Sequence, residues 1–368
     1  MHVARISHIF YPDIRSDYLL ELSERQTAFG HKVSVLTWNK SKRKNEVYSD
    51  SLKILRLPGV NFSIKGMFEA FPYIPSLPQE ISRIKPDIVH AESHLFLTSY
   101  QAIMRAKKLG IRSVVTVHGV MAKRNIMVDC AQHVYLNTLG SKIFKNADKV
   151  ICLTENDAKE IMKLGCTSEK VAIIPNAIDT QRFCPRQVKD ANLVTWVGRF
   201  VPEKGVRYLI EAARLVVKDF KDVRFSLVGY GGLRNELMNL ASKYDLLDNI
   251  SFSSSLCRDE VAELLGRSSV FAFPSVKEGM PMAVLEAMSA ENAVVAFNIS
   301  GTSEIITNNH NGLLVTPCNP NELAAAVLRL IVDKSIARKL GKRARETVKR
   351  RYSWEALLES LNKVYYSK

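Results

Sequence analysis

Short apolar runs alternate with longer amphipathic segments along nearly the whole chain, in two successive series. The first series includes the runs 3–8, 32–37 and 112–117, and the second begins with 193–197 and continues through 270–273. This alternation is typical of parallel sheets that carry helices on both faces. The pattern predicts an α/β protein with two tandem doubly wound domains. Such sheets bind ligands beyond the carboxyl ends of their strands, so we expect a ligand site in a cleft between the domains.

A polar segment, 179–192, separates the two series and is the best candidate for a linker. We expect an N-terminal Rossmann-like domain over 1–178 and a C-terminal Rossmann-like domain over 193–350, followed by a last helix within 351–368. The chain has 368 residues, which is enough for two domains that each bury a core of their own.

The composition indicates a soluble globular protein, because 46% of the residues are hydrophobic and 24% are charged. No apolar run approaches the roughly 18 residues that a membrane-spanning helix needs. The first ten residues resemble a first strand rather than a signal peptide. Six scattered cysteines form no Cys-x-x-Cys pair, which argues against a zinc site and a disulfide scaffold. We therefore expect a cytoplasmic protein.

The formal net charge is +15; residues 1–185 hold 26 Lys and Arg residues against 17 Asp and Glu residues, a net of +9, which leaves +6 for the remainder. A basic surface suits nucleic acid, an anionic membrane or phosphorylated substrates, and ordinary solvated surface is an equal alternative. No zinc finger, basic zipper or aromatic ribonucleoprotein motif is present, so we expect no nucleic-acid partner. The apolar, irregular segment 60–78 favours peripheral docking on the inner, anionic membrane face.

The most specific stretch of sequence is 277–288, KEGMPMAVLEAM. Pro281 suits the first position of a helix, where a missing N–H costs nothing. That helix carries Glu286 among apolar neighbours, where a carboxylate needs a hydrogen-bond donor such as a ligand hydroxyl. Glu278 precedes the helix, and the free N–H groups near Gly279 and Met280 suit an anionic or hydroxyl-rich ligand. The alternative is a helix cap at Glu278 and a solvated acid at Glu286.

Other polar and glycine residues follow predicted strands. Gly198, Arg199 and Lys204 lie in a strand–loop–helix junction that could hold a diphosphate, although loops with one Arg and one Lys are common. Gly229 belongs to a Gly-x-Gly turn after another strand, a weak signal by itself. His118 also ends a strand, and alone it is more simply a structural histidine.

Taken together, these residues supply two cations for a diphosphate and two acids for sugar hydroxyls. The combination fits a nucleotide-sugar better than a dinucleotide. The first strand is not followed by Gly-x-Gly-x-x-Gly, so hydride transfer is not supported. We see no Asp-x-Asp in a site position and expect neither a metal nor a cofactor beyond the nucleotide-sugar itself.

At this point the chain resembles the family 4 retaining glycosyltransferases, group 1, of the two-Rossmann-domain GT-B fold. The resemblance covers nearly the whole sequence and rests on KPDIVH at 85–90, TVHG at 116–119, IPNAID at 174–179, VGRF at 197–200, LVGYG at 227–231, FPSVKEGMP at 273–281 and EAM at 286–288.

The resemblance implies a role for each matching residue. Arg199 and Lys204 would bind the donor diphosphate. Glu278 would hydrogen-bond the transferred sugar, and Glu286 would bind the ribose hydroxyls. His118 would lie beside the sugar near the reacting carbon. Gly279, Met280 and Pro281 would line the sugar pocket, and the last helix would cross back onto the first domain.

The chain departs from the family pattern in the loop after the first strand. Members usually have a glycine pair there, close to the donor phosphates and the acceptor, whereas this chain has Ser16 and Asp17. Side chains at this point narrow the space on the acceptor side. The loop favours an alternative function as a nucleotide-sugar binding pseudo-enzyme.

We therefore expect a metal-independent, retaining hexosyltransferase. Its donor would be a UDP- or GDP-sugar, and its acceptor the hydroxyl of a glycan or a lipid-linked molecule in surface polysaccharide or glycoconjugate synthesis. A sugar-nucleotide epimerase of related fold is a further alternative.

Overall fold

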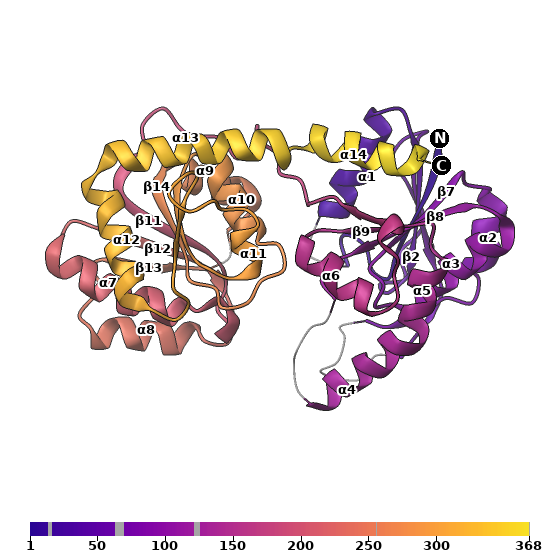
Figure 1. The fold of residues 1–368 in the computed structure, drawn as a ribbon, viewed down its shortest axis with the longest axis horizontal. Helices are drawn as coiled ribbons and strands as arrows, with labels where there is room; N and C mark the ends of the chain where they lie inside the picture. Colours follow the sequence, from indigo (N-terminus) through magenta and orange to yellow (C-terminus); the bar gives the residue numbers. More distant parts are fainter. Residues whose placement is uncertain (14–16, 63–69, 121–125, 255, 368) are drawn as a thin grey trace. The chain divides into compact units, whose positions relative to one another are not determined.

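The computed structural model describes residues 1–13, 17–62, 70–120, 126–254 and 256–367 (Figure 1). The chain divides into two compact units. Unit 1 consists of Met1–Pro175 together with Leu358–Lys368, and unit 2 consists of Asn176–Leu357. Each unit has its own sheet and its own hydrophobic core.

Unit 1 is built on an eight-stranded sheet in which all neighbouring strands are parallel except β3 and β4. The strand order is β10-β9-β8-β7-β1-β2-β4-β3. The strands are β1 (His2–Ser7), β2 (Lys32–Trp38), β3 (Glu46–Val47), β4 (Leu52–Leu57), β7 (Ile88–Glu92), β8 (Arg112–Val117), β9 (Lys149–Cys152) and β10 (Val171–Ile173).

The first strand of unit 1 lies in the middle of its sheet. Strands β2, β4 and β3 follow on one side of β1, and β7 to β10 follow on the other. The strand order therefore reverses between β1 and β7, and loops that leave the carboxyl ends of these two strands diverge. Such a switch point is where doubly wound sheets form ligand sites.

Helices cover this sheet, and one of them comes from the far end of the sequence. They are α1 (Tyr18–Ala28), α2 (Leu77–Ile84), α3 (Leu97–Leu109), α4 (Ile126–Tyr135), a π-helical turn (Leu136–Gly140), α5 (Ser141–Asn146), α6 (Glu155–Lys163) and a 3₁₀ turn (Ser168–Lys170). A small hairpin of β5 (Val60–Asn61) and β6 (Pro72–Tyr73) precedes α2.

The last helix, α14 (Trp354–Tyr366), begins in unit 2 and ends in unit 1. Its apolar side chains Leu361, Val364 and Tyr365 are buried. Nε2 of His31, just after α1, is 2.7 Å from Oδ1 of Asn362, which fixes the helix against this unit. The prediction that the last helix returns to the first domain is therefore confirmed.

Unit 2 is built on a six-stranded, fully parallel sheet in the order β13-β12-β11-β14-β15-β16. The strands are β11 (Asp190–Arg199), β12 (Arg224–Tyr230), β13 (Ile250–Ser253), β14 (Ser268–Phe273), β15 (Ala293–Phe297) and β16 (Leu313–Val315). The strand order again reverses beside the first strand, here between β11 and β14.

The helices of unit 2 form two groups. In Figure 1 the strands lie between α7 and α12 on one side and α9 and α10 on the other. The bounds are a 3₁₀ turn (Pro202–Lys204), α7 (Val206–Asp219), α8 (Arg234–Lys243), α9 (Arg258–Arg267), α10 (Met282–Ser289), α11 (Ser300–Ser303), α12 (Pro320–Val332) and α13 (Lys334–Arg351). Strand β14 supplies buried Phe271 and Phe273 to the core between these layers.

The two parallel sheets with helices on their faces confirm the predicted α/β class and the two Rossmann-like domains. Within the described ranges, no helix combines the length and the apolar character needed to cross a membrane. All six cysteines are free.

Candidate functional site

A cavity of about 450 Å³ opens in unit 2 at the switch point between β11 and β14. It brings together the two cations and the two acids that the sequence singled out, Arg199, Lys204, Glu278 and Glu286. Its other lining residues are Val197, Gly198, Val228, Gly229, Tyr230, Leu256, Val261, Phe273, Met280, Pro281, Met282 and Ala283. A volume of this size suits a small organic ligand.

Gly229 lets the strands β11 and β12 lie close together beside the cavity. Gly198 pairs with Gly229 in the parallel ladder. A Cβ atom on Gly229 would lie 1.7 Å from the carbonyl oxygen of Gly198, so no larger residue fits without moving the strands.

Arg199 follows Gly198 in the sequence and is exposed. Among the described residues its guanidinium has no hydrogen-bond or ion-pair partner, so it is available to an anion.

Lys204 is directed into the cavity by the glycine that follows it. Gly205 has φ +61°, and a Cβ there would lie 2.0 Å from the carbonyl oxygen of Pro274. This left-handed residue ends the 3₁₀ turn and starts α7. Nζ of Lys204 lies 2.5 Å from Oε1 of Glu278 and 5.5 Å from the centre of the Phe273 ring.

Glu278 is therefore paired with a cation and does not cap a helix. Its Oε1 also accepts a hydrogen bond of 2.5 Å from the hydroxyl of Ser275. The Glu278 side chain is 11% exposed and that of Lys204 19%, so the pair borders the cavity rather than bulk water. The two opposite charges offset each other at this shielded position.

Glu286 lies on α10 but is less isolated than the sequence suggested. Its side chain is 16% exposed, and Oε1 lies 4.0 Å from Nη2 of Arg258 at the start of α9. A protein cation therefore stands near this acid, in addition to the ligand hydroxyls that the sequence suggested as donors. The remaining exposure leaves the carboxylate open to the cavity.

The start of α10 also differs by one residue from the prediction. Pro281 has extended backbone (φ −78°, ψ 99°) and is the N-cap, and the helix begins at Met282. Met282 and Ala283, in the first turn of α10, line the cavity, and the start of a helix favours anionic or hydroxyl-rich ligands. Met280 and Pro281 line the cavity, whereas Gly279 is exposed and lies outside its lining.

His118 belongs to unit 1, at the carboxyl end of β8. Its Nε2 lies 2.9 Å from Oε2 of Glu92, the last residue of β7. Its side chain is 33% exposed, while that of Glu92 is only 5% exposed. Asp17 is the residue just before α1, and Ser16 lies outside the described residues.

Sequence reasoning missed three residues that contact the predicted ones, namely Ser275 beside Glu278, Arg258 beside Glu286, and Glu92 beside His118. Of these, Glu92 could have been predicted as a site residue, because it is the last residue of a buried strand next to the switch point. In the part of the chain that the structure describes, no three His, Cys, Asp or Glu side chains gather closely enough to hold a metal ion.

Comparison with known proteins shows to which family this chain is related. The family described as "Glycosyl transferases group 1" matches residues 177–347, and "Glycosyltransferase Family 4" matches residues 16–182. An uncharacterized glycosyltransferase of Methanocaldococcus jannaschii is 30% identical over 289 residues, 76% of this chain and 75% of the relative.

Two further relatives have described activities. The UDP-Gal:alpha-D-GlcNAc-diphosphoundecaprenol alpha-1,3-galactosyltransferase of Escherichia coli is 29% identical and covers 77% of this chain and 76% of its own length. The Gpi3 subunit of the Schizosaccharomyces pombe phosphatidylinositol N-acetylglucosaminyltransferase is 25% identical and covers 98% of this chain and 80% of its own length.

Solved structures share the fold at low sequence identity. The sucrose-phosphate synthase of Thermosynechococcus elongatus superimposes with a TM-score of 0.76 at 21% identity, over 99% of this chain and 98% of the other. The HepE protein of Anabaena, in complex with UDP and glucose, gives a TM-score of 0.78 at 16% identity over the full length of both chains.

Proposed function

This chain belongs to the group 1, family 4 glycosyltransferases, and on that premise we propose that it transfers a sugar from a nucleoside-diphosphate sugar to a hydroxyl acceptor. One observation carries the proposal. Arg199, Lys204, Glu278 and Glu286 line a single cavity at the switch point of unit 2. In one cavity, the two cations can bind a diphosphate, and the two acids can accept hydrogen bonds from the sugar hydroxyls on either side of it.

In this proposal the cations stabilise the leaving group. The bond between the anomeric carbon and the diphosphate oxygen breaks, and negative charge grows on that oxygen. Arg199, Lys204 and the first-turn N–H groups of α10 would hold this charge, and each well-placed donor contributes about 3 kcal/mol. We propose that these groups act without a divalent metal.

We further propose that the reaction retains the anomeric configuration. The acceptor oxygen would bond to the anomeric carbon on the face that the diphosphate leaves, and the acceptor's proton would pass to the departing phosphate oxygen. The cavity lining includes the carboxylates of Glu278, held by Lys204 and Ser275, and of Glu286, which lies near Arg258. We assign both to hydroxyl binding and so propose a route without a covalent sugar–enzyme intermediate.

The pair Lys204–Glu278 suggests how the donor is accepted. When the diphosphate enters, Lys204 would move its charge-assisted hydrogen bond from Glu278 to a phosphate oxygen. Glu278 would then accept a hydrogen bond from a hydroxyl of the transferred sugar, with Ser275 still holding its carboxylate. Glu286 would accept hydrogen bonds from the ribose hydroxyls beside Arg258.

For the acceptor, we propose a glycan or a lipid-linked hydroxyl. Two relatives act on acceptors of this kind by name, a diphosphoundecaprenol-linked sugar in Escherichia coli and phosphatidylinositol in Schizosaccharomyces pombe. By the resemblance to the family, His118 would lie beside the transferred sugar, and Asp17 would border the acceptor.

A thermal-shift screen tests donor binding. We expect a UDP- or GDP-sugar to raise the unfolding temperature, since a ligand at 100 times its Kd stabilises a protein by about 2.7 kcal/mol. Arg199→Ala should weaken this shift, whereas Arg207→Ala, an exposed cation paired with Glu211 on α7, should leave it unchanged. If UDP-, GDP- and ADP-sugars all fail to stabilise the wild-type chain, the proposed donor is wrong.

Product analysis separates transfer from the two rival functions. A pseudo-enzyme would bind the donor without hydrolysing it, whereas a transferase slowly releases free sugar to water when no acceptor is present. An epimerase would convert the donor to its epimer without any acceptor. Chromatography of the donor after long incubation distinguishes all three results.

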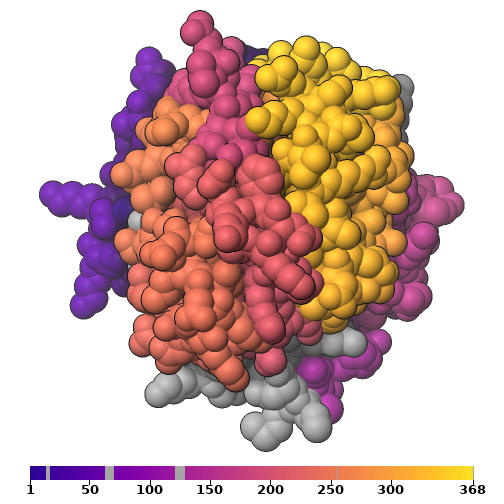
Figure 2. Space-filling model, turned by 90° about the vertical axis from the view of Figure 1, so that its left-hand side faces the viewer, coloured from indigo at the N-terminus to yellow at the C-terminus, as the bar shows by residue number. Residues whose placement is uncertain are grey.

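We also propose that the protein docks on an anionic membrane surface. Around the segment 60–78, the described side chains Val60, Phe62 and Tyr73 are 55%, 58% and 42% exposed. In unit 2, α13 has the sequence KSIARKLGKRARETVKRR, nine cations against one acid. In Figure 2 unit 2 faces the viewer, and α12 and α13 (yellow) form a broad exposed band on it. Each cation near an anionic bilayer contributes about 1 kcal/mol.

Liposome co-sedimentation tests this docking. We expect binding to vesicles that contain phosphatidylglycerol, little binding to phosphatidylcholine alone, and loss of binding as salt rises. Changing the exposed cations Arg338 and Lys342 of α13 to glutamate should reduce the bound fraction. The matched change of Lys218 and Lys243, at the ends of α7 and α8, should reduce it less. Binding that ignores anionic lipid content would contradict the proposal.

A further inference from the structure

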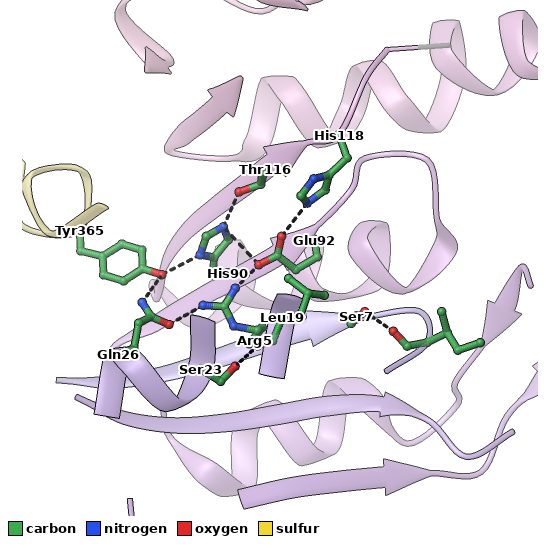
Figure 3. Close-up of polar contacts among 11 residues, drawn as sticks. Arg5, Ser7, Leu19, Ser23, Gln26, His90, Glu92, Thr116, His118 and Tyr365 are labelled. Atoms are coloured by element: carbon green, nitrogen blue, oxygen red, sulfur yellow. Dashed lines mark hydrogen bonds and ion pairs between the residues drawn. The ribbon is translucent and has the colours of Figure 1, made fainter. Parts of the chain in front are cut away.

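A chain of polar side chains runs through the interior of unit 1 from α14 to His118 (Figure 3). It starts at the hydroxyl of Tyr365, which lies 3.2 Å from Nε2 of Gln26. Oε1 of Gln26 accepts from Nη2 of Arg5, and Nη1 of Arg5 donates to Oε1 of Glu92. The other carboxylate oxygen of Glu92 lies 2.9 Å from Nε2 of His118. His118 is the most exposed member, and the others are buried.

The charge of Glu92 is fixed by its surroundings. Burial alone would raise the pKa of this carboxyl, but the buried guanidinium of Arg5 and the neighbouring His90 and His118 lower the pKa to about 2. Glu92 is therefore an anion at any pH at which the protein is used. An ionised carboxylate only accepts hydrogen bonds.

His90 belongs to a second branch of the network and is neutral. Burial lowers the pKa of His90 to about 4 and raises the pKa of Tyr365 to about 12. The neutral phenol lies 2.6 Å from Nδ1 of His90, and Nε2 of His90 lies 2.7 Å from the hydroxyl of Thr116. The phenol can therefore donate to His90, and His90 to Thr116. The positive charge that holds Glu92 in the interior is then that of Arg5.

The protonation of His118 follows from the geometry. Because Glu92 only accepts, Nε2 of His118 must carry a proton, and in the neutral ring Nδ1 then carries the lone pair. Within the described ranges, Nδ1 of His118 makes no hydrogen bond. The ring therefore has one nitrogen anchored in the interior and one nitrogen left to accept a proton or a hydrogen bond.

We propose that Glu92 is a positioning residue that holds His118 in its Nε2–H tautomer, so that Nδ1 accepts a hydrogen bond from a hydroxyl of the sugar or of its acceptor. Arg5 holds Glu92, and Tyr365 holds Arg5 through Gln26. The inference rests on the proposed transferase function, in which His118 lies beside the transferred sugar.

The tautomer itself is measurable without any change to Glu92. We expect long-range ¹H–¹⁵N correlation spectra of the full-length protein to show the Nε2–H pattern for His118, assigned by its loss in His118→Gln. An Nδ1–H tautomer in the wild-type protein would overturn the proposal whatever the activity.

A substitution tests the effect on turnover. Glu92→Gln keeps the shape but offers either an oxygen or an NH₂ group, so His118 should populate both tautomers. We expect kcat to fall about 10- to 100-fold with the donor KM little changed. Glu92→Asp, which keeps the charge, should recover part of the loss. In the matched control Glu46→Gln, which removes a carboxylate paired with Arg56 elsewhere in unit 1, kcat should be unchanged.

The outcomes separate this proposal from the donor assignment. A folded Glu92→Gln protein with wild-type kcat and an unchanged His118 spectrum would overturn the role of Glu92. If Glu92→Gln fails to fold because Arg5 loses its partner, the wild-type spectrum still decides. Absence of any thermal shift with sugar nucleotides would instead overturn the proposed function, while leaving the tautomer result intact.

Discussion

Alanine at Arg199 or at Lys204 is expected to lower kcat by about 10²- to 10³-fold, the loss that follows removal of one donor from a preorganised charge-stabilising site. The two variants should differ in stability. Arg199 is exposed, so its removal should leave unfolding unchanged. Lys204 balances the half-buried Glu278, so its removal should also destabilise unit 2. Steady-state kinetics with a sugar donor, together with thermal unfolding, measures both effects.

Arg207→Ala provides the control for these variants. Arg207 lies close in sequence to Lys204 and carries the same charge as Arg199, but its side chain is 67% exposed and pairs with Glu211. We expect kcat within a factor of about two of wild type, since surface changes of this kind have small effects. Full activity in both Arg199→Ala and Lys204→Ala would show that this cavity does not bind the diphosphate through these two side chains.

Alanine at Gly229 is expected to reduce the free energy of unfolding of unit 2 by about 3 kcal/mol. A Cβ there would stand 1.7 Å from the carbonyl oxygen of Gly198, a backbone atom that cannot rotate away as a side chain would. The strands β11 and β12 would have to separate beside the cavity. Urea unfolding followed by circular dichroism gives the change.

Gly232→Ala is the matched control, three residues further along the chain and just after β12. A Cβ at Gly232 would meet no atom within 4 Å. We expect its unfolding free energy to stay within about 0.5 kcal/mol of wild type. Equal stabilities for the two alanine variants would show that the close contact between β11 and β12 is relieved at little cost.

The fold was predictable because hydrophobic alternation directly reports buried parallel strands. The errors lie at element ends, where polar residues still join a ladder. Strand β11 begins at Asp190, which pairs with Ser268, although the apolar run starts only at Leu193. Pro281 illustrates the same limit, since a proline suits both the first helical position and the residue before it.

The cavity was only partly predictable. Strand ends and glycines indicated which residues would lie near the carboxyl edge, and the structure gathers four of them around one hollow. The contact between Lys204 and Glu278 joins residues 74 positions apart and depends on the left-handed Gly205. Likewise, Arg258 reaches Glu286 from a separate helix. Sequence periodicity carries no information about which side chains meet across loops.

The shared helix α14 has a consequence for how the protein is made. Unit 1 needs Leu361, Val364 and Tyr365 to complete its interior, yet the whole of unit 2, Asn176–Leu357, is synthesised before them. Domains usually fold in order as they emerge, at about 5–20 residues per second. Here the first part of unit 1, Met1–Pro175, must wait until unit 2 has been synthesised, with part of its apolar surface uncovered. A protein truncated after Leu357 should therefore depend on chaperones, although every residue before the truncation is present.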